Sequence, residues 1–164
     1  MKKIFVFLVV LLSFTAVNAG LIVEKGKTAP EFSIYPLKGK KVNLSSLKGK
    51  KAVLVNIFAT TCEPCKEELP FMVKLYEQYK DDIEFIGITV TDTKKYEVDE
   101  FVKKYKMTFP VCLDYSKTFY KLYISGGFNM PTNIFINKEG IIVDIQGALK
   151  ETQAKKIIEE LIKK

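Results

Sequence analysis

Two nearly uninterrupted apolar runs constrain the fold of this chain more than any other feature. Residues 51–58 read KAVLVNIF and residues 83–90 read IEFIGITV, and polar residues bound both runs. Runs of this length without alternation are typical of strands buried on both faces of a sheet. Segments with helical spacing separate the strands, and a hairpin pattern lies near the C-terminus. We therefore expect an α/β fold with a central mixed sheet flanked by helices.

Apolar spacing and turn residues predict the other elements. A helix follows Cys62 and runs to about Tyr79, and Pro70 inside it lacks the N–H for a helical hydrogen bond and should kink it. Ser116 is a candidate cap for a short helix that ends at Tyr123. The remaining expected elements are strands at 32–35 and 42–44, a helix at 94–105, an extended piece at 109–113, strands at 132–136 and 141–147, and an amphipathic helix at 150–164.

Residues 1–19 have the pattern of an export signal. Met1-Lys2-Lys3 gives a positive start, residues 4–17 are uncharged and mostly apolar, and Val17-Asn18-Ala19 offers small residues for cleavage. The apolar stretch is shorter than the roughly 20 residues of a spanning helix, and an uncleaved anchor is the alternative. Residues 20–164 are then expected to form a single domain. The expected location is periplasmic or otherwise extracytoplasmic.

The absence of His and Arg excludes several classes of function. Without His the chain cannot build a Ser-His-Asp or Cys-His nucleophile, or a His-ligated metal site. All 26 basic residues are Lys, so the bidentate Arg contacts that read guanine or grip phosphate are missing. We expect no nucleic-acid partner, and the net charge of +7 favours solubility instead.

Cys62 and Cys65 carry the strongest chemical signal. The two thiols lie three residues apart at the start of a helix that follows a buried strand. The free N–H groups and positive dipole end of that helix would stabilise a thiolate on Cys62. Cys65, one turn inside, would be shielded and close enough to attack a mixed disulfide on Cys62. Pro64 suits the first helical position, where a missing N–H costs nothing.

Two other interpretations of the pair are weaker. A purely structural disulfide would close a loop of only four residues, which the chain-entropy model values at about 2 kcal/mol. A zinc site would have only Cys112 left as a thiol ligand, and a buried apolar position is the default for such a cysteine. A CxxC pair beside strand–helix–strand spacing favours redox chemistry, with no metal.

Three motifs together are similar to those of a known family. They are Cys62-Glu63-Pro64-Cys65, Pro70 five residues later, and Met130-Pro131-Thr132 before a predicted strand. In this order they resemble the thioredoxin fold, and more closely the TlpA/ResA-like thiol–disulfide oxidoreductases. The resemblance covers residues 27–163. It implies a thioredoxin-like fold with an N-terminal β-extension and a central αβ insert, and no cofactor beyond the Cys62–Cys65 disulfide.

The resemblance also implies roles for single residues. Cys62 corresponds to the attacking thiol and Cys65 to the resolving thiol. Pro131 corresponds to a cis-proline against the disulfide, which exposes the backbone of Met130 to an extended substrate. Thr132 belongs to the same substrate-binding segment.

Acidic residues near the pair have two interpretations. Glu68 falls where this family places a carboxylate, which would oppose thiolate formation and serve as proton donor or acceptor. The alternative is a solvated charge on the first helical turn. Asn56 occupies the strand position where thioredoxin itself has a buried acid, which leaves Glu68 as the acid–base group. Glu63 and Pro64 match the family's spacer between the cysteines, and Glu63 is expected to tune the site.

The implied function is reduction of disulfides in other exported proteins. The resemblance points to apocytochrome c during cytochrome c maturation as substrate, and to a membrane thiol-reductant conductor that resets the pair. We expect a monomer. Thr61 replaces the family's usual Trp before the first cysteine, and residues 126–130 differ from the usual approach to the cis-proline. Both departures bear on which partner protein binds, and not on the chemistry of the cysteines.

Two alternatives come from proteins with the same fold. Peroxiredoxins share the start Ala29-Pro30-Glu31-Phe32, but their attacking cysteine normally follows a Pro and has a Thr three residues before it. Here Ala59 stands three residues before Cys62. Copper metallochaperones of this fold use a wider cysteine spacing and a His ligand, and this chain has no His.

Overall fold

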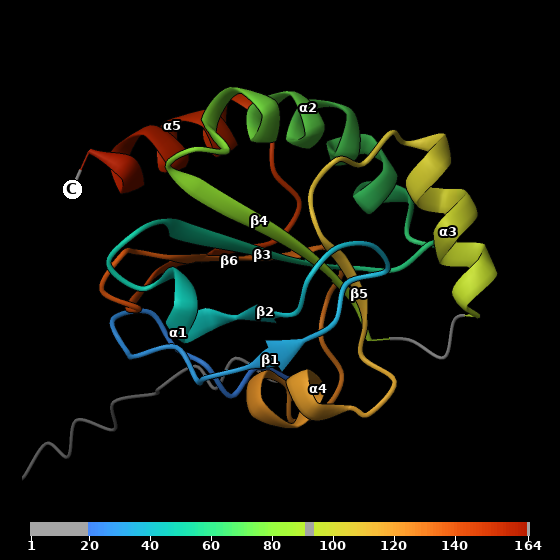
Figure 1. Ribbon diagram of the computed structural model, residues 1–164, viewed down its shortest axis with the longest axis horizontal. Coiled ribbons are helices and arrows are strands. Elements are labelled where there is room, and N and C mark those ends of the chain that lie inside the picture. Colours follow the sequence, from blue (N-terminus) through green and yellow to red (C-terminus); the bar gives the residue numbers. More distant parts are fainter. Residues whose placement is uncertain (1–19, 91–93, 164) are drawn as a thin grey trace, which may run out of the picture.

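A five-stranded mixed sheet forms the centre of the computed structural model, which describes residues 20–90 and 94–163 (Figure 1). In spatial order its strands are β5 (Val111–Leu113), β4 (Ile83–Thr89), β3 (Ala52–Phe58), β6 (Thr132–Ile136) and β7 (Ile142–Gln146). β3 and β5 run parallel to β4, whereas β6 is antiparallel to β3 and β7 to β6. The predicted mixed sheet is confirmed. The predicted export signal lies outside the described residues.

Helices cover both faces of the sheet (Figure 1). On one face lie α2 (Glu63–Tyr79), α3 (Lys95–Lys104) and α5 (Glu151–Ile162). On the other lie α1 (Leu44–Leu47), α4 (Thr118–Tyr123) and an antiparallel pair, β1 (Ser33–Ile34) with β2 (Val42–Asn43). β1 and β2 form the expected N-terminal extension, and α3 with β5 forms the expected insert.

The side chains of β3 alternate between two hydrophobic cores. Leu54 and Phe58 belong to the core beneath α2 and α5, and Val53 and Val55 belong to the core on the opposite face. All seven residues of β3 are buried, which explains its uninterrupted apolar run. Asn56 has the parity of Leu54 and Phe58, so this polar side chain lies on the α2 face of the sheet.

Element boundaries differ from expectation at a few places. The two N-terminal strands are only two residues long each. Residues 44–47 form α1, a helix that the sequence analysis does not predict, because its four residues are too few to show helical spacing. Pro70 lies inside α2, and the helix continues past it to Tyr79.

The expected cap of α4 is wrong. The residue before this helix is Lys117, in the left-handed region with φ of 53°, and not Ser116. Asp114 takes over the capping role, because its carboxylate accepts the backbone N–H groups of Phe119 at 3.2 Å and Tyr120 at 2.7 Å. A carboxylate that accepts from two first-turn donors also complements the helix dipole.

The first described residues are attached to the loop that leads toward β6. The N–H of Ile22 donates to the carbonyl of Tyr123 at 2.9 Å, and that of Ser125 donates to the carbonyl of Gly20 at 3.0 Å. Gly20 has φ of +110°, and a Cβ atom there would lie 1.8 Å from the carbonyl oxygen of Gly127. The close backbone contact therefore requires glycine at position 20.

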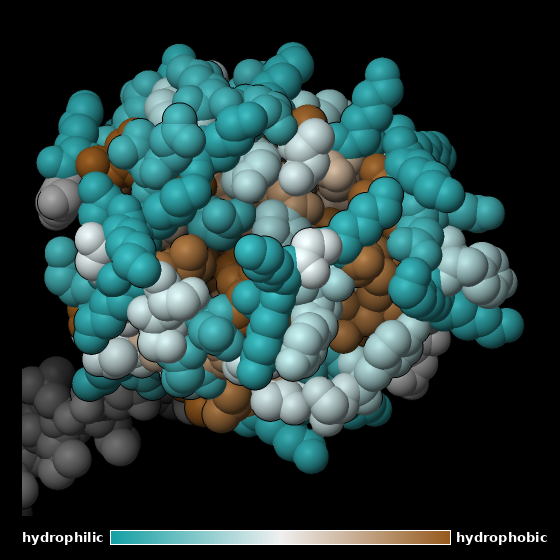
Figure 2. Space-filling view, viewed as in Figure 1, coloured by the Kyte–Doolittle hydropathy of each residue, from teal (hydrophilic) through white to brown (hydrophobic). Residues whose placement is uncertain are grey.

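Polar side chains dominate the surface in the view of Figure 2, and apolar side chains show mainly in recesses. Some Lys side chains are paired, as Lys95 is with Asp99 at 2.7 Å. Exposed pairs of this kind contribute little to stability. No helix within the described part of the chain combines the length and hydropathy that crossing a bilayer requires.

Candidate active site

The candidate site lies at one end of the central strands of the sheet, where β3 finishes. β3 ends at Phe58, and a short loop joins it to α2. In the antiparallel register Ile57 of β3 lies opposite Thr132, the first residue of β6. The Met130–Pro131 segment therefore approaches the sheet at the end of the strands from which the loop to α2 departs.

A disulfide joins Cys62 and Cys65, with a Cα–Cα distance of 5.3 Å. Cys62 is the N-cap of α2, and its Sγ accepts the N–H of Cys65 at 3.2 Å. Cys62 is half-buried, whereas Cys65 is only 1% exposed, as predicted for the inner cysteine. Pro64 is the second residue of the helix and not the first, a position that equally needs no N–H partner. Because Cys65 is buried, Cys62 is the cysteine of the pair that is open to an incoming thiol or disulfide.

Glu63 and Lys66 form an exposed pair beside the disulfide. The Lys66 Nζ donates to a Glu63 carboxylate oxygen at 2.6 Å, and Glu63 is the first residue of α2. This hydrogen bond raises the pKa of the Lys66 ammonium. The negative charge of Glu63 is thus partly balanced next to Cys62, at the surface of the molecule.

Glu68 is a buried carboxyl group, one turn after Cys65 on α2, and is 1% exposed. Its Oε1 accepts the Nδ2 of Asn56 at 2.8 Å, and its Oε2 accepts the N–H of Leu149 at 3.2 Å. Asn133 Nδ2 donates to both oxygens, at 3.4 and 3.3 Å. Burial raises the pKa of Glu68, and these hydrogen bonds only partly offset the rise. Glu68 is therefore not a solvated charge on the first turn.

Sequence reasoning missed Asn133, the second amide of this network. It lies in β6 directly opposite Asn56, is fully buried, and accepts the Nδ2 of Asn56 at 2.8 Å. An Asn inside each of two predicted strands was the available signal, because amides that become buried need partners. Because 77 residues separate Asn56 from Asn133, the sequence alone does not show that the two amides pair with each other.

The Met130–Pro131 peptide bond is cis, as the family resemblance predicts. Met130 is partly buried, while Pro131 and Thr132 are buried. The Thr132 hydroxyl donates to the carbonyl of Asn129 at 2.6 Å and so ties the start of β6 to the preceding loop. The side chains of Cys62 and Met130 both pack against the α2-side core.

Cys112 is separate from this site. It is a free, buried thiol on β5 and belongs to the core on the opposite face of the sheet from Cys65. Burial, with a smaller contribution from the charge of Asp114, raises the pKa of Cys112 to about 12. Among the described residues, no three His, Cys, Asp or Glu side chains are grouped closely enough to hold a metal ion.

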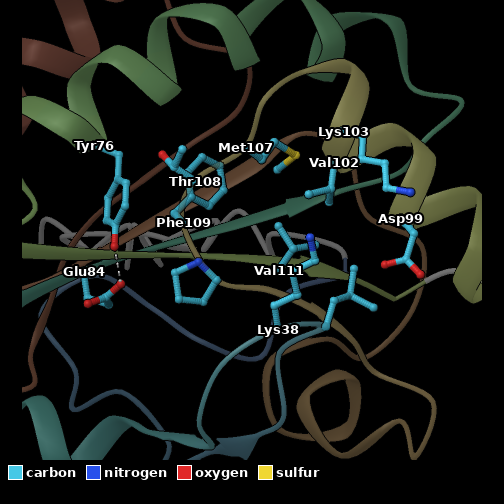
Figure 3. Close-up of a pocket in the computed structure, with 12 residues that line it drawn as sticks. Lys38, Tyr76, Glu84, Asp99, Val102, Lys103, Met107, Thr108, Phe109 and Val111 are labelled. Carbon is cyan, nitrogen blue, oxygen red and sulfur yellow. Dashed lines mark hydrogen bonds between the residues drawn. The ribbon is translucent and has the colours of Figure 1, made fainter.

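A cavity of about 410 Å³ also lies apart from the cysteines, between α2, α3 and β5. Figure 3 shows Tyr76 on one of its walls, with the Tyr76 hydroxyl donating to Glu84 at 3.0 Å. Lys103 and Asp99 of α3 lie on the opposite side of the same view. None of the predicted site residues lines this cavity.

These features define a class of protein. A CxxC disulfide caps the helix after the central strand, with a half-buried outer cysteine and a cis-proline segment at the same end of the strands. This is the arrangement of a thioredoxin-fold thiol–disulfide oxidoreductase. A family model described as AhpC/TSA matches residues 25–145, and the chain belongs to this family.

Curated relatives and solved structures agree with this class. The chain is 38% identical over 142 residues to "Thiol-disulfide oxidoreductase ResA" of Bacillus thuringiensis subsp. konkukian, covering 86% of this chain and 78% of the relative. It is 35% identical over 147 residues to the ResA of Bacillus subtilis, covering 87% and 80%. The solution structure of a proposed protein disulfide isomerase from Bacteroides thetaiotaomicron superposes with a TM-score of 0.80 at 33% identity, covering 90% and 96%.

A crystal structure of a thiol:disulfide interchange protein from Chlorobium tepidum superposes with a TM-score of 0.72 at 28% identity, covering 85% of this chain and 99% of the other. The predicted TlpA/ResA-like membership and thioredoxin-like fold are confirmed. The protein is an enzyme of thiol–disulfide exchange. Enzymes of this class act through their own cysteines.

Proposed function

We propose that this enzyme works outside the cytoplasm and reduces disulfides in other exported proteins. The observation that carries the proposal is the asymmetry of the pair, with Cys62 half-buried at a helix N-terminus and Cys65 fully buried. The positive end of the α2 dipole stabilises negative charge on the Cys62 sulfur. The pattern of residues 1–19, cleaved or kept as an anchor ahead of one domain at 20–164, supports export.

The reaction proceeds in two exchanges. The Cys62 thiolate attacks one sulfur of the substrate disulfide, a mixed disulfide forms, and the other substrate sulfur leaves as a thiolate. Cys65 then loses its proton and attacks the Cys62 sulfur. The bond between Cys62 and the substrate breaks, the second substrate sulfur leaves, and the Cys62–Cys65 disulfide remains. Two electrons have passed from the enzyme to the substrate.

Glu68 is proposed as the group that takes the proton from Cys65. It is one helical turn from Cys65 on the buried face of α2, where side chains three residues apart are neighbours. Burial raises the pKa of Glu68 above its ordinary value, which makes its carboxylate a stronger proton acceptor. Glu63, which is exposed, tunes the charge near Cys62 instead.

The substrate is proposed to bind as an extended segment along residues 130–132. Cys62 and this segment lie at the same end of the central strands, and an extended peptide can pair with the backbone of Met130 there. From the family resemblance, apocytochrome c is proposed as the substrate and a membrane thiol-reductant conductor as the source of electrons. The enzyme is proposed to act as a monomer, without metal or other cofactor.

Single-cysteine variants test the assigned roles. Cys62→Ser is expected to lower the rate of insulin or model-peptide disulfide reduction at least ~100-fold, because the nucleophile is lost. Cys65→Ser is expected to accumulate a mixed disulfide through Cys62, visible by mass spectrometry. The matched control is Cys112→Ala, which should keep full activity. Full activity in either of the first two variants would refute the roles of the pair.

The reduction potential tests the direction of electron flow. A reductase should equilibrate with dithiothreitol or glutathione near the value of thioredoxin, about −270 mV. A value near that of a strong oxidant such as DsbA, about −120 mV, would instead make the enzyme a disulfide donor. Peroxide consumption by the reduced enzyme, and a tight stoichiometric copper complex, are the outcomes that would favour the two alternative functions.

A further inference from the structure

The amide groups of Asn56 and Asn133 surround the carboxyl group of Glu68 from the sheet side. The two residues are direct partners in the β3–β6 register, and both are almost fully buried, at 2% and 0% exposure. Glu68 enters from α2 above them. The third donor, the N–H of Leu149, comes from the segment that precedes α5. Four separate segments of the chain thus meet at one carboxyl group.

Hydrogen bonds fix which way each amide points. Asn133 Nδ2 donates to the carbonyl of Gly147 at 3.0 Å as well as to Glu68, and Asn133 Oδ1 accepts from Asn56. Asn56 Nδ2 then has one hydrogen for Asn133 and one for Glu68, and both are used. Asn133 is therefore the residue that orients Asn56 as well as a donor in its own right.

All groups aimed at the Glu68 oxygens are donors. A carboxylate satisfies three donors, whereas a protonated carboxyl would turn a hydrogen toward one of them. Within the described residues, Asn56 Oδ1 is the one buried side-chain polar atom without a partner. The sheet keeps this unsatisfied acceptor, at a cost in stability, while directing the amide hydrogens to Glu68.

We propose that Asn133 is a positioning residue for thiol–disulfide exchange, which acts through Asn56 and directly to hold the Glu68 carboxylate in its proton-accepting form one turn from Cys65. This inference rests on the proposed function of Glu68. In the resolving step the Cys65 thiol gives its proton to Glu68, the new bond forms between Cys65 and Cys62, and the bond from Cys62 to the substrate breaks. The substrate leaves as a thiolate.

Few other charges act on Glu68. The nearest titratable residues along α2 are Cys65, Lys66 and Glu67, of which only Cys65 is fully buried. At the start of α5 the exposed side chains of Lys150 and Glu151 follow Leu149. β3 and β6 contribute the two amides. Burial and hydrogen bonds account for the direction of the pKa shift of Glu68, without a charged partner.

The test uses the reduced enzyme and 5,5′-dithiobis(2-nitrobenzoate), a small disulfide that needs no protein-binding surface. Attack by Cys62 releases one coloured thiolate, and resolution by Cys65 releases the second. The rate of the second release is measured against pH in the wild type, Asn133→Ala and Asn133→Ser. Asn137→Ala is the matched control, because Asn137 follows the same strand and loses a hydrogen bond to Ile141 without touching Glu68.

For both Asn133 variants, the pH at which the rate of the second release is half-maximal (the midpoint) is expected to rise by about one pH unit. Asn137→Ala should leave the midpoint unchanged. In a Glu68→Gln background, Asn133→Ala should produce no further shift, because the residue acts through Glu68. Circular dichroism shows whether a variant has lost its fold. Asn133→Ser is the second variant for the same test if Asn133→Ala does not fold.

The possible outcomes separate the two claims. A wild type that releases only one thiolate would overturn the proposed roles of the cysteines. Normal second release in the wild type, with Asn133→Ala and Asn137→Ala giving the same midpoint, would overturn the positioning role alone. An equal shift from Asn133→Ala with and without Glu68 would also overturn it.

Discussion

Burial decides how the thiols of this chain differ in reactivity. Cys62 caps a helix at the surface, where N–H groups and the helix dipole favour a thiolate. Cys112 has neither advantage, because it is enclosed in a β5 edge position and faces the apolar core opposite to α2. A sequence distinguishes the two cysteines by context, and the structure shows that the distinction is one of solvent access.

The first prediction concerns Cys112. Because burial raises the pKa of its thiol to about 12, the native reduced protein should titrate two thiols rapidly near pH 8 and a third only after denaturation. Thiol counting with a chromogenic disulfide in native and denaturing buffer measures this. Cys112→Ala should give two thiols in both buffers. A third rapidly reacting thiol in the native wild type would contradict the prediction.

At the residue scale the sequence indicated the cysteine pair, but not all of the buried groups that surround Glu68. Cys62 and Cys65 were visible because their spacing is local, whereas Glu68 was identified through the family resemblance. Asn133 was not, because its role depends on strand pairing with Asn56 across 77 residues. The pKa direction of Glu68 likewise follows from burial, which spacing alone does not reveal.

At the scale of elements, long periodic segments were predictable and short ones were not. The two apolar runs became β3 and β4, and the spacing after Cys62 became α2. α1 has too few residues to show a period, and the start of α4 depends on a left-handed residue at Lys117 that no pattern signals. Periodicity does not show which strands pair, so it does not predict the order of strands in the sheet.

The second prediction concerns the N-terminal bridge between residues 20–23 and residues 123–125. Gly20→Ala should detach this bridge, because a Cβ would collide with the carbonyl of Gly127 and positive φ disfavours alanine. Gly26→Ala is the matched control: φ is +84°, but the surrounding space is open, so only the backbone cost of about 1–2 kcal/mol applies.

Hydrogen exchange at Ser125 and Ile22 measures this detachment. Both N–H groups bond across the bridge, so they should exchange faster in Gly20→Ala than in Gly26→Ala. Equal protection in the two variants would show that the contact with Gly127 does not hold the bridge together.

At the scale of the whole molecule, the buried carboxyl of Glu68 links stability to pH. Its pKa is raised above 4.5 in the folded protein, so the folded state binds more protons than the unfolded state in this range. The free energy of unfolding attributable to Glu68 therefore falls as pH rises from about 4.5 through the folded pKa. Above the pKa of Glu68 in the folded protein, the loss of stability that the buried carboxylate causes is complete.

The third prediction follows from this linkage. The free energy of unfolding of the wild type minus that of Glu68→Gln should decrease with pH across the same window and become constant above it. Chemical denaturation of the oxidised proteins at pH values from about 4 to 8 measures the difference. Glu139→Gln, at an exposed turn, is the control and should not reproduce the trend. A difference that grows with pH would contradict the prediction.

The placement of Cys112 and the CxxC pair on opposite faces of the sheet has a consequence for how the chain matures. Once β3 and β4 have closed the core, a layer of strands separates Cys112 from either active cysteine. A wrongly paired bridge can then arise only while the polypeptide is still open. An oxidising compartment can therefore form a wrong disulfide with Cys112 only before the chain folds. In the folded protein the sheet keeps Cys112 apart from Cys62 and Cys65.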